Sequence, residues 1–269
     1  YVNNLKLRKV SDKVETQVAG LPQNARITNI SWSQNEKKIG FTNTTNTGVE
    51  LWVIDVATAT AKKITEANLN ANLGSPYSWM KDNETLLVKM LPKNRPALID
   101  SKKDLPKGPT VSTSDGSKSQ NRTYQDLLKN KTDEANFDAL VTSELYKVSL
   151  SGKTELFKEA DIYAGESFSP DGTYLMLTTI QKPYSYIVPL SRFPQKSVVY
   201  DLNGKEIKVV NEVPLTEVMP KGFSSVRKGK RSMNWRADKP ATLTYVVALD
   251  EGDQSKKVDF RDEVLTWDA

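Results

Sequence analysis

Three arginines are the residues of this chain best suited to hold a ligand. Arg192 lies between two prolines in PLSRFP, and Arg227 and Arg231 enclose the basic run RKGKR. A guanidinium can bind a carboxylate through two parallel hydrogen bonds, so all three are candidate substrate-binding residues. The alternative is that Arg192 braces neighbouring carboxylates or loop carbonyls, and that Lys228 and Lys230 belong to a solvated turn.

Histidine and cysteine are absent from the 269 residues. A Ser-His-Asp or Cys-His arrangement therefore cannot form within this chain, and disulfides and thiolate chemistry are excluded. A conventional zinc site is not expected either, because its usual ligands are cysteine and histidine. The sequence predicts no catalytic residue, no metal and no cofactor in this chain.

Other polar and aromatic motifs are better explained by folding than by chemistry. Asp171-Gly172 in SPDGTY has the composition that a tight turn requires, and this interpretation is preferred to a carboxylate site. Tyr184 and Tyr186 stand at alternate positions, so we expect them to share one strand face and to serve in packing.

Charge and hydropathy limit the classes of partner that we expect this chain to bind. The formal net charge is +5, but the basic run at 227–231 has no interleaved aromatic residues and no recognition helix, so we expect no nucleic-acid partner. No apolar run approaches the roughly 20 residues of a membrane-spanning helix, so we expect no membrane partner.

A short sequence motif that occurs four times indicates the strands and turns that must position these residues. Each copy begins with an aromatic residue, continues through turn residues and ends in an alternating apolar run; the copies are WSQNEKKIGFT from Trp32, WMKDNETLLVK from Trp79, FSPDGTYLMLT from Phe168 and WRADKPATLTYV from Trp235. Repeated strand-turn-strand units predict an all-β propeller of about four blades, each of four antiparallel strands. The four aromatic anchors are expected to pack between blades rather than to form a ligand cage.

The blade boundaries follow from the spacing of these phrases. We expect a single domain over 1–269, with residues 1–20 as outer strands of a preceding or ring-closing blade and with blades at 26–66, 72–160, 161–213 and 222–269. An insertion at 92–122 is rich in Pro, Lys, Ser, Asp and Gly, and is either a solvated loop or a mobile gate. One short helix is predicted in TYQDLLKN, with Thr123 as its N-cap.

Longer strings resemble one protein family. RTYQDLLKNKTDEANFDALVTSEL, KPYSYIVPLSRFP and FSSVRKGKRSMNWRADKPATLTYVVALDEGD are similar to the N-terminal propeller of prolyl oligopeptidase-family serine peptidases, closest to the glutamyl endopeptidase group of bacteria and plant chloroplasts. In that family an α/β-hydrolase domain with a G-x-S-x-G elbow carries the Ser, Asp and His of the triad. The resemblance covers nearly the whole chain but includes no triad residue.

The resemblance implies a division of labour. The expected partners are a C-terminal α/β-hydrolase domain of the same parent chain, which cleaves, and a peptide substrate, which the propeller admits while folded proteins are excluded. The chain should be inactive alone, and exposed blade edges could also associate with each other. The alternative is a stand-alone propeller that binds a protein or peptide partner. A periplasmic or secreted bacterial location is favoured, with a cytoplasmic or organellar one as the alternative.

Overall fold

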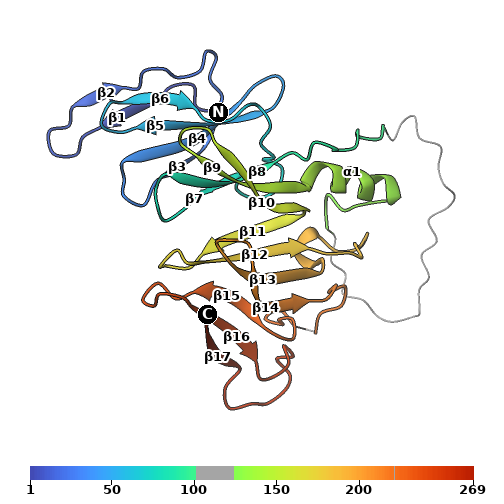
Figure 1. Cartoon of the computed structure of the whole chain (residues 1–269). Helices are drawn as coiled ribbons and strands as arrows, with labels where there is room; N and C mark the ends of the chain where they lie inside the picture. Colours follow the sequence, from blue (N-terminus) through green and yellow to red (C-terminus); the bar gives the residue numbers. More distant parts are fainter. Residues whose placement is uncertain (101–123, 221) are drawn as a thin grey trace. The chain divides into compact units, whose positions relative to one another are not determined.

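A computed structural model describes residues 1–100, 124–220 and 222–269 and is built almost entirely of β-strands (Figure 1). The chain divides into two compact units. Unit 1 comprises Tyr1–Arg95 and Val141–Asp161, and unit 2 comprises Pro96–Leu140 and Ile162–Ala269. Most of the predicted insertion, including the gate or loop proposed for it, lies outside the described residues. No helix in the described part is long and apolar enough to cross a membrane.

Unit 1 contains two four-stranded antiparallel sheets and one hairpin. The sheets have the orders β3-β4-β5-β6 and β10-β9-β8-β7, and β1 pairs with β2 in the hairpin. The bounds are β1 Lys6–Arg8, β2 Glu15–Gln17, β3 Ile27–Trp32, β4 Lys38–Thr44, β5 Val49–Asp55, β6 Thr60–Lys63, β7 Tyr77–Trp79, β8 Thr85–Met90, β9 Ser143–Ser149 and β10 Thr154–Asp161. Consecutive strands are neighbours throughout, as in a propeller blade.

Unit 2 contains a four-stranded sheet, a three-stranded sheet and most of the single α-helix of the described residues. The sheets have the orders β11-β12-β13-β14 and β15-β16-β17, again with consecutive antiparallel neighbours. The bounds are α1 Lys131–Val141, β11 Tyr163–Phe168, β12 Tyr174–Ile180, the 3₁₀ helix η1 Leu190–Arg192, β13 Gln195–Asp201, β14 Glu206–Val213, β15 Arg231–Trp235, β16 Thr242–Ala248 and β17 Asp262–Asp268. The predicted all-β class with blade-like sheets and one short helix is confirmed.

The helix, however, begins later in the chain than its predicted N-cap, Thr123, would require. Residues 124–130 are not helical, and α1 begins at Lys131. Asn130 is the residue that starts it, because its Oδ1 accepts a hydrogen bond of 2.9 Å from the backbone N–H of Asp133. The carboxylate of Asp133 in turn accepts a hydrogen bond from the N–H of Lys129, so two side chains at the start of α1 satisfy one backbone donor in the helix and one before it. Thr123 itself lies outside the described residues.

One predicted turn is confirmed by its hydrogen bonds. In SPDGTY the N–H of Gly172 donates to the carbonyl of Ser169 at 2.8 Å, and Asp171 accepts from Ser169 and Thr173. Gly172 has φ 76°, a conformation that glycine adopts without strain. The carboxylate of Asp171 is therefore occupied by its own turn.

In unit 1 the second sheet packs on the first through an aromatic pair in β7. Tyr77 donates from its hydroxyl to the carbonyl of Asn29 at 2.6 Å and accepts from the hydroxyl of Ser31 at 2.9 Å. The indole Nε1 of Trp79 donates to the carbonyl of Ser31 at 3.3 Å. The ring of Tyr77 lies over Gly40, where an added Cβ would be only 2.8 Å from it. A residue without a side chain at position 40 is thus what allows the two sheets this close approach.

The aromatic anchors are not all buried as expected. Trp79 is 7% exposed and belongs to a core cluster with Leu51, Leu86 and Val148, which confirms its predicted role. Phe168 and Trp235 are partly buried. Trp32 is 52% exposed, so the prediction is wrong for this position. The reason is that the burial of an anchor depends on a full sheet before its own, and in unit 1 only the hairpin of β1 and β2 precedes β3–β6.

We expect Trp79→Phe to lower the free energy of unfolding of the chain by about 1–3 kcal/mol, because a buried hydrogen bond and part of a buried ring are lost. Trp32→Phe is the matched control. Its indole is half exposed and donates to no described residue, so the same change should cost less than about 0.5 kcal/mol. Urea denaturation followed by circular dichroism measures both, and equal losses would contradict this account of sheet packing.

A cross-strand ion pair makes the first sheet sensitive to acid. Lys38 on β4 and Asp55 on β5 are register partners, and the Lys38 ammonium bonds the Asp55 carboxylate. This bond, with further donors from Thr58, lowers the pKa of Asp55 from about 3.8 to about 2. Because the folded-state pKa lies below the ordinary one, the stabilisation is complete above about pH 4 and disappears as the pH falls through 2.

We therefore expect Asp55→Asn to be less stable than wild type at pH 7 by about 1 kcal/mol at most, since the carboxylate is about one third exposed and screened by water. The difference should shrink as the pH falls from about 4 to about 2. Urea midpoints across this range check it. A difference that stayed constant with pH would mean that the pair contributes nothing.

Candidate functional site

Arg231 is the first residue of β15, and its side chain is largely buried. Its guanidinium bonds the carboxylate of Asp262 at the start of β17; the two side chains are 20% and 50% exposed, respectively. The Nε of Arg231 is buried and has no hydrogen-bond partner among the described residues. One of its donor groups is thus left unused, which is rare for a buried polar atom.

Arg227 lies in the segment before β15, and its guanidinium donates to two backbone carbonyls, those of Lys228 and Lys230. Burial lowers its pKa, and the nearby positive charge of Arg231 lowers it further. Two guanidinium groups therefore lie close together, with Asp262 as the ion-pair partner of one. The structure brings Arg227 and Arg231 into one basic cluster that could accept an anion.

Lys230 extends the same cluster and is not simply solvated. Its ammonium donates to the carbonyl of Val210 at 3.0 Å and lies 4.9 Å from the ring centroid of Tyr245. Lys228, in contrast, is exposed and pairs with Glu251. The expected solvated turn is therefore confirmed for Lys228 and is wrong for Lys230, whose long side chain packs over an aromatic ring.

Arg192 stands apart from this cluster. It ends η1, is partly buried, and lies with its guanidinium carbon 5.5 Å from the ring centroid of Tyr124. No contact in the described part of the chain joins it to Arg227 or Arg231. The hydroxyl of Tyr124 is buried and has no hydrogen-bond partner within the part of the chain that the structure describes. The sequence predicted a substrate-binding role for all three arginines, whereas the structure brings only Arg227 and Arg231 close together.

The segment that carries Arg192 is anchored to α1. Tyr184 and Lys182 both bond the carboxylate of Asp138, and the hydroxyl of Tyr186 donates to Glu134 at 2.8 Å. Tyr184 also stacks on Phe193 at 5.2 Å between ring centroids. The expected packing role of Tyr184 is confirmed, but the two tyrosines do not share a strand face, because residues 181–189 form a loop.

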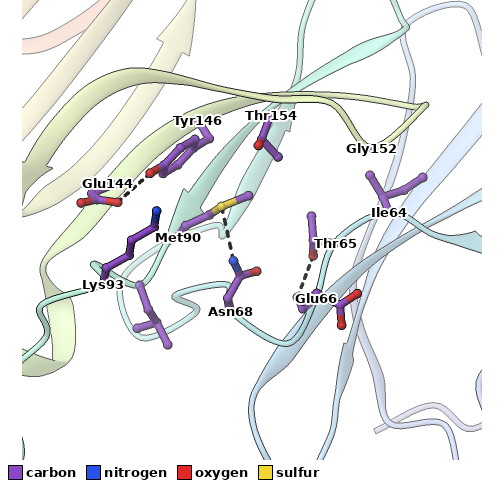
Figure 2. A pocket seen from close by; sticks show the side chains of 11 residues that line it. Ile64, Thr65, Glu66, Asn68, Met90, Lys93, Glu144, Tyr146, Gly152 and Thr154 are labelled. Carbon is purple, nitrogen blue, oxygen red and sulfur yellow. Dashed lines mark hydrogen bonds between the residues drawn. The ribbon is translucent and has the colours of Figure 1, made fainter.

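A cavity of about 360 Å³ lies within unit 1 (Figure 2), and none of the three arginines is among its lining residues. Glu144 and Tyr146 on β9 lie on one side of it, and Thr65 and Glu66 on the segment after β6 lie on the other. Met90, Ile64 and Leu91 add apolar surface, and Lys93 adds a cation. The cavity therefore offers two carboxylates, a phenol and an amine beside apolar side chains.

Glu144 and Tyr146 act as a pair in this cavity. The Tyr146 hydroxyl donates to Glu144 at 2.9 Å, and this bond raises the pKa of the tyrosine. The phenol therefore keeps its proton and does not act as a base, and its one O–H donor is used by Glu144. Sequence analysis missed this pair. The alternation in SELYKVS places both side chains on one strand face, but it does not show which face borders a cavity.

In the described ranges, no group of three or more Asp, Glu, His or Cys side chains is placed to hold a metal ion. Neither the cavity nor the arginine cluster contains a nucleophile paired with a base. What these arrangements can do chemically is to bind, through guanidinium donors in unit 2 and through mixed polar groups in unit 1.

No protein-family model matches the chain. The chain is 39% identical over 265 residues to a protein of Oryza sativa subsp. japonica named probable glutamyl endopeptidase, chloroplastic. The match covers 95% of this chain and 28% of the rice protein. The resemblance to the glutamyl endopeptidase group is confirmed. The chain thus spans little more than a quarter of the length of this glutamyl endopeptidase relative.

Solved structures show the fold alone. An acylaminoacyl peptidase in complex with Z-Gly-Gly-Phe-chloromethyl ketone has a TM-score of 0.50 at 13% identity, covering 98% of this chain and 33% of that one. An oligogalacturonate lyase in complex with manganese has a TM-score of 0.51 at 12% identity, covering 98% and 56%. Because a peptidase and a lyase fit about equally well, the architecture by itself does not select an activity for this chain.

Proposed function

We propose that this chain is the non-catalytic propeller portion of a serine peptidase of the prolyl oligopeptidase family, similar to glutamyl endopeptidases. The observation that carries the proposal is the 39% identity to the rice protein across 95% of the chain. The absence of histidine supports it, because a Ser-His-Asp triad would have to be supplied by another part of the parent chain. The proposed partner is therefore an α/β-hydrolase domain in that same chain.

In this proposal the propeller portion covers the active site and limits access to peptides. Sheets held together by buried contacts such as those of Tyr77 and Trp79 form a rigid cover, and a rigid cover excludes folded proteins by size. The selection is steric, so it requires no reacting group from this chain. The covered site also excludes bulk water, which strengthens every charge interaction between substrate and protein.

The arginines supply the proposed chemical preference. The cluster of Arg227 and Arg231 carries two positive charges close together, and no described residue is a hydrogen-bond partner of the buried Nε of Arg231. A substrate carboxylate would compensate this surplus through charge-assisted hydrogen bonds. Arg192 remains a predicted substrate-binding residue, although its stacking on Tyr124 equally fits a bracing role. The ligand class is an acidic peptide.

The access filter can be tested on the parent protein with one acidic sequence in two contexts. The sequence is offered as a free peptide and as a short tail held close to a large folded domain. We expect kcat/KM to fall by on the order of 100-fold for the tethered form, because the cover excludes the folded domain. An unrelated endopeptidase with an open cleft and the same specificity is the control and should cleave both similarly. Equal rates for the parent protein would refute the cover.

The acidic preference is tested in the parent protein with peptides that differ only by Glu or Gln. Arg231→Met should reduce the Glu-over-Gln ratio of kcat/KM by about tenfold, the value of one charge-assisted hydrogen bond. Arg236→Met is the matched control, since Arg236 pairs with Asp238 in a turn and should leave the ratio unchanged. If the Arg231 variant keeps the ratio while folding normally, the cluster serves only to brace the loop.

A further inference from the structure

The cavity of unit 1 begins where the apolar core of that unit ends. Val148, Tyr146 and Glu144 stand at alternate positions of β9, so they share one face of the strand. Val148 is fully buried in the core, Tyr146 is partly buried against it, and Glu144 lines the cavity (Figure 2). Met90 on β8 is the register partner of Glu144 and is 5% exposed. Neighbouring strands thus supply a polar and an apolar wall.

The segment that forms another wall is held by backbone hydrogen bonds on both of its sides. The N–H of Leu69 donates to the carbonyl of Val49 on β5 at 3.0 Å, and the N–H of Leu91 donates to the carbonyl of Asn68 at 2.8 Å. The side-chain amide of Asn68 also lies 3.6 Å from the sulfur of Met90. Because these walls are already ordered, a ligand would lose little affinity to ordering them.

Two charged groups of the cavity are not neutralised by an ion pair. Glu144 accepts the hydroxyl of Tyr146 on Oε2, and its Oε1 has no partner in the described part of the chain. The ammonium of Lys93 is exposed and bonds no other described residue. Glu66 differs, because Lys63 bonds both of its oxygens at 3.1 and 3.0 Å. The cavity therefore presents one unpaired anion and one unpaired cation.

The anionic side is prepared for a cationic ligand group. The hydroxyl of Tyr146 holds one oxygen of Glu144 and leaves the other available to a donor. Glu159 adds a second negative charge near Tyr146, and both carboxylates raise the pKa of its hydroxyl. An ammonium suits this acceptor best, because it combines three N–H donors with a positive charge.

We propose that this cavity binds a free α-amino acid with an apolar side chain. The ammonium of the ligand bonds Glu144, its carboxylate bonds Lys93, and its side chain packs on Met90 and Ile64. The volume of about 360 Å³ lies at the lower end of the range of ligand pockets, roughly 300–1,000 Å³, and so suits a single amino acid. This site shares no residue with the arginine cluster, and the inference goes beyond the proposed function.

Isothermal titration calorimetry of the purified parent protein tests the site, after a serine-directed inhibitor has blocked any peptidase site. The probes are leucine, N-acetyl-leucine, which lacks the ammonium, and leucinamide, which lacks the carboxylate. We expect leucine to bind, and N-acetyl-leucine to bind at least about tenfold more weakly, the value of one charge-assisted hydrogen bond. Leucinamide should bind about threefold more weakly, because Lys93 is exposed.

Three outcomes with these probes would overturn the proposal. The first is the absence of leucine binding at millimolar concentrations, and the second is equal affinity for leucine and N-acetyl-leucine. The third is tighter binding of leucyl-leucine than of leucine, which would assign the cavity to a peptide. These comparisons use the wild-type protein, so they remain decisive if a variant fails to fold.

Variants then assign each ligand group to its residue. Glu144→Gln should weaken leucine about tenfold and leave N-acetyl-leucine unchanged, and Lys93→Met should weaken leucine about threefold and leave leucinamide unchanged. Glu66→Gln is the matched control, since Glu66 lines the same cavity but is already paired with Lys63. Circular dichroism checks that each variant is folded. An equal loss in Glu66→Gln and Glu144→Gln would overturn the assignment.

These experiments are independent of those on the proposed function. None of them measures peptide cleavage, so a failure here leaves the access filter and the acidic preference to their own tests. Equally, a parent protein that cleaves tethered and free peptides at one rate would still bind leucine as described.

Discussion

The contact between successive sheets, made by an aromatic pair on the inner strand, is the interaction on which the structure of each unit depends. A single four-stranded sheet buries too little apolar surface to be stable alone, so each sheet needs a neighbour. In unit 1 Tyr77 and Trp79 satisfy this need with three hydrogen bonds and a close approach over Gly40. The loops and strand ends that hold the candidate ligand-binding residues are displayed on sheets fixed in this way.

The role proposed for the arginine cluster requires no reacting group from this chain. Arg231 begins β15 and Arg227 lies only four residues earlier, so the chain itself forces two like charges together. Partial burial raises the cost of both charges, and Asp262 pairs with one of them. A carboxylate from a substrate would relieve this cost. At Arg227, hydrogen bonds to backbone carbonyls already offset part of this cost. A measurement must therefore distinguish a role in bracing the loop from a role in binding substrate.

Local patterns predicted the elements that depend on neighbouring residues. The SPDG turn forms as expected, because its hydrogen bonds join residues a few positions apart. The helix illustrates the limit of such patterns. Thr123 and Asn130 are both acceptable N-caps, and the choice of Asn130 coincides with the bonds that Glu134 and Asp138 make to the tyrosines of a distant loop. Those contacts are more than 40 residues apart in sequence, so no local pattern contains them.

The sequence by itself determined the strand repeat, the resemblance to glutamyl endopeptidases and the absence of a triad, since these follow from residue types and short spacings. Only the tertiary structure decided which arginines lie together, that a cavity forms beside Glu144 and Tyr146, and that Trp79 is buried while Trp32 is half exposed. The physical reason is that a side chain on a sheet is buried only when a second surface packs against it. Two tryptophans that open the same kind of repeat differ because one has a sheet packed against it.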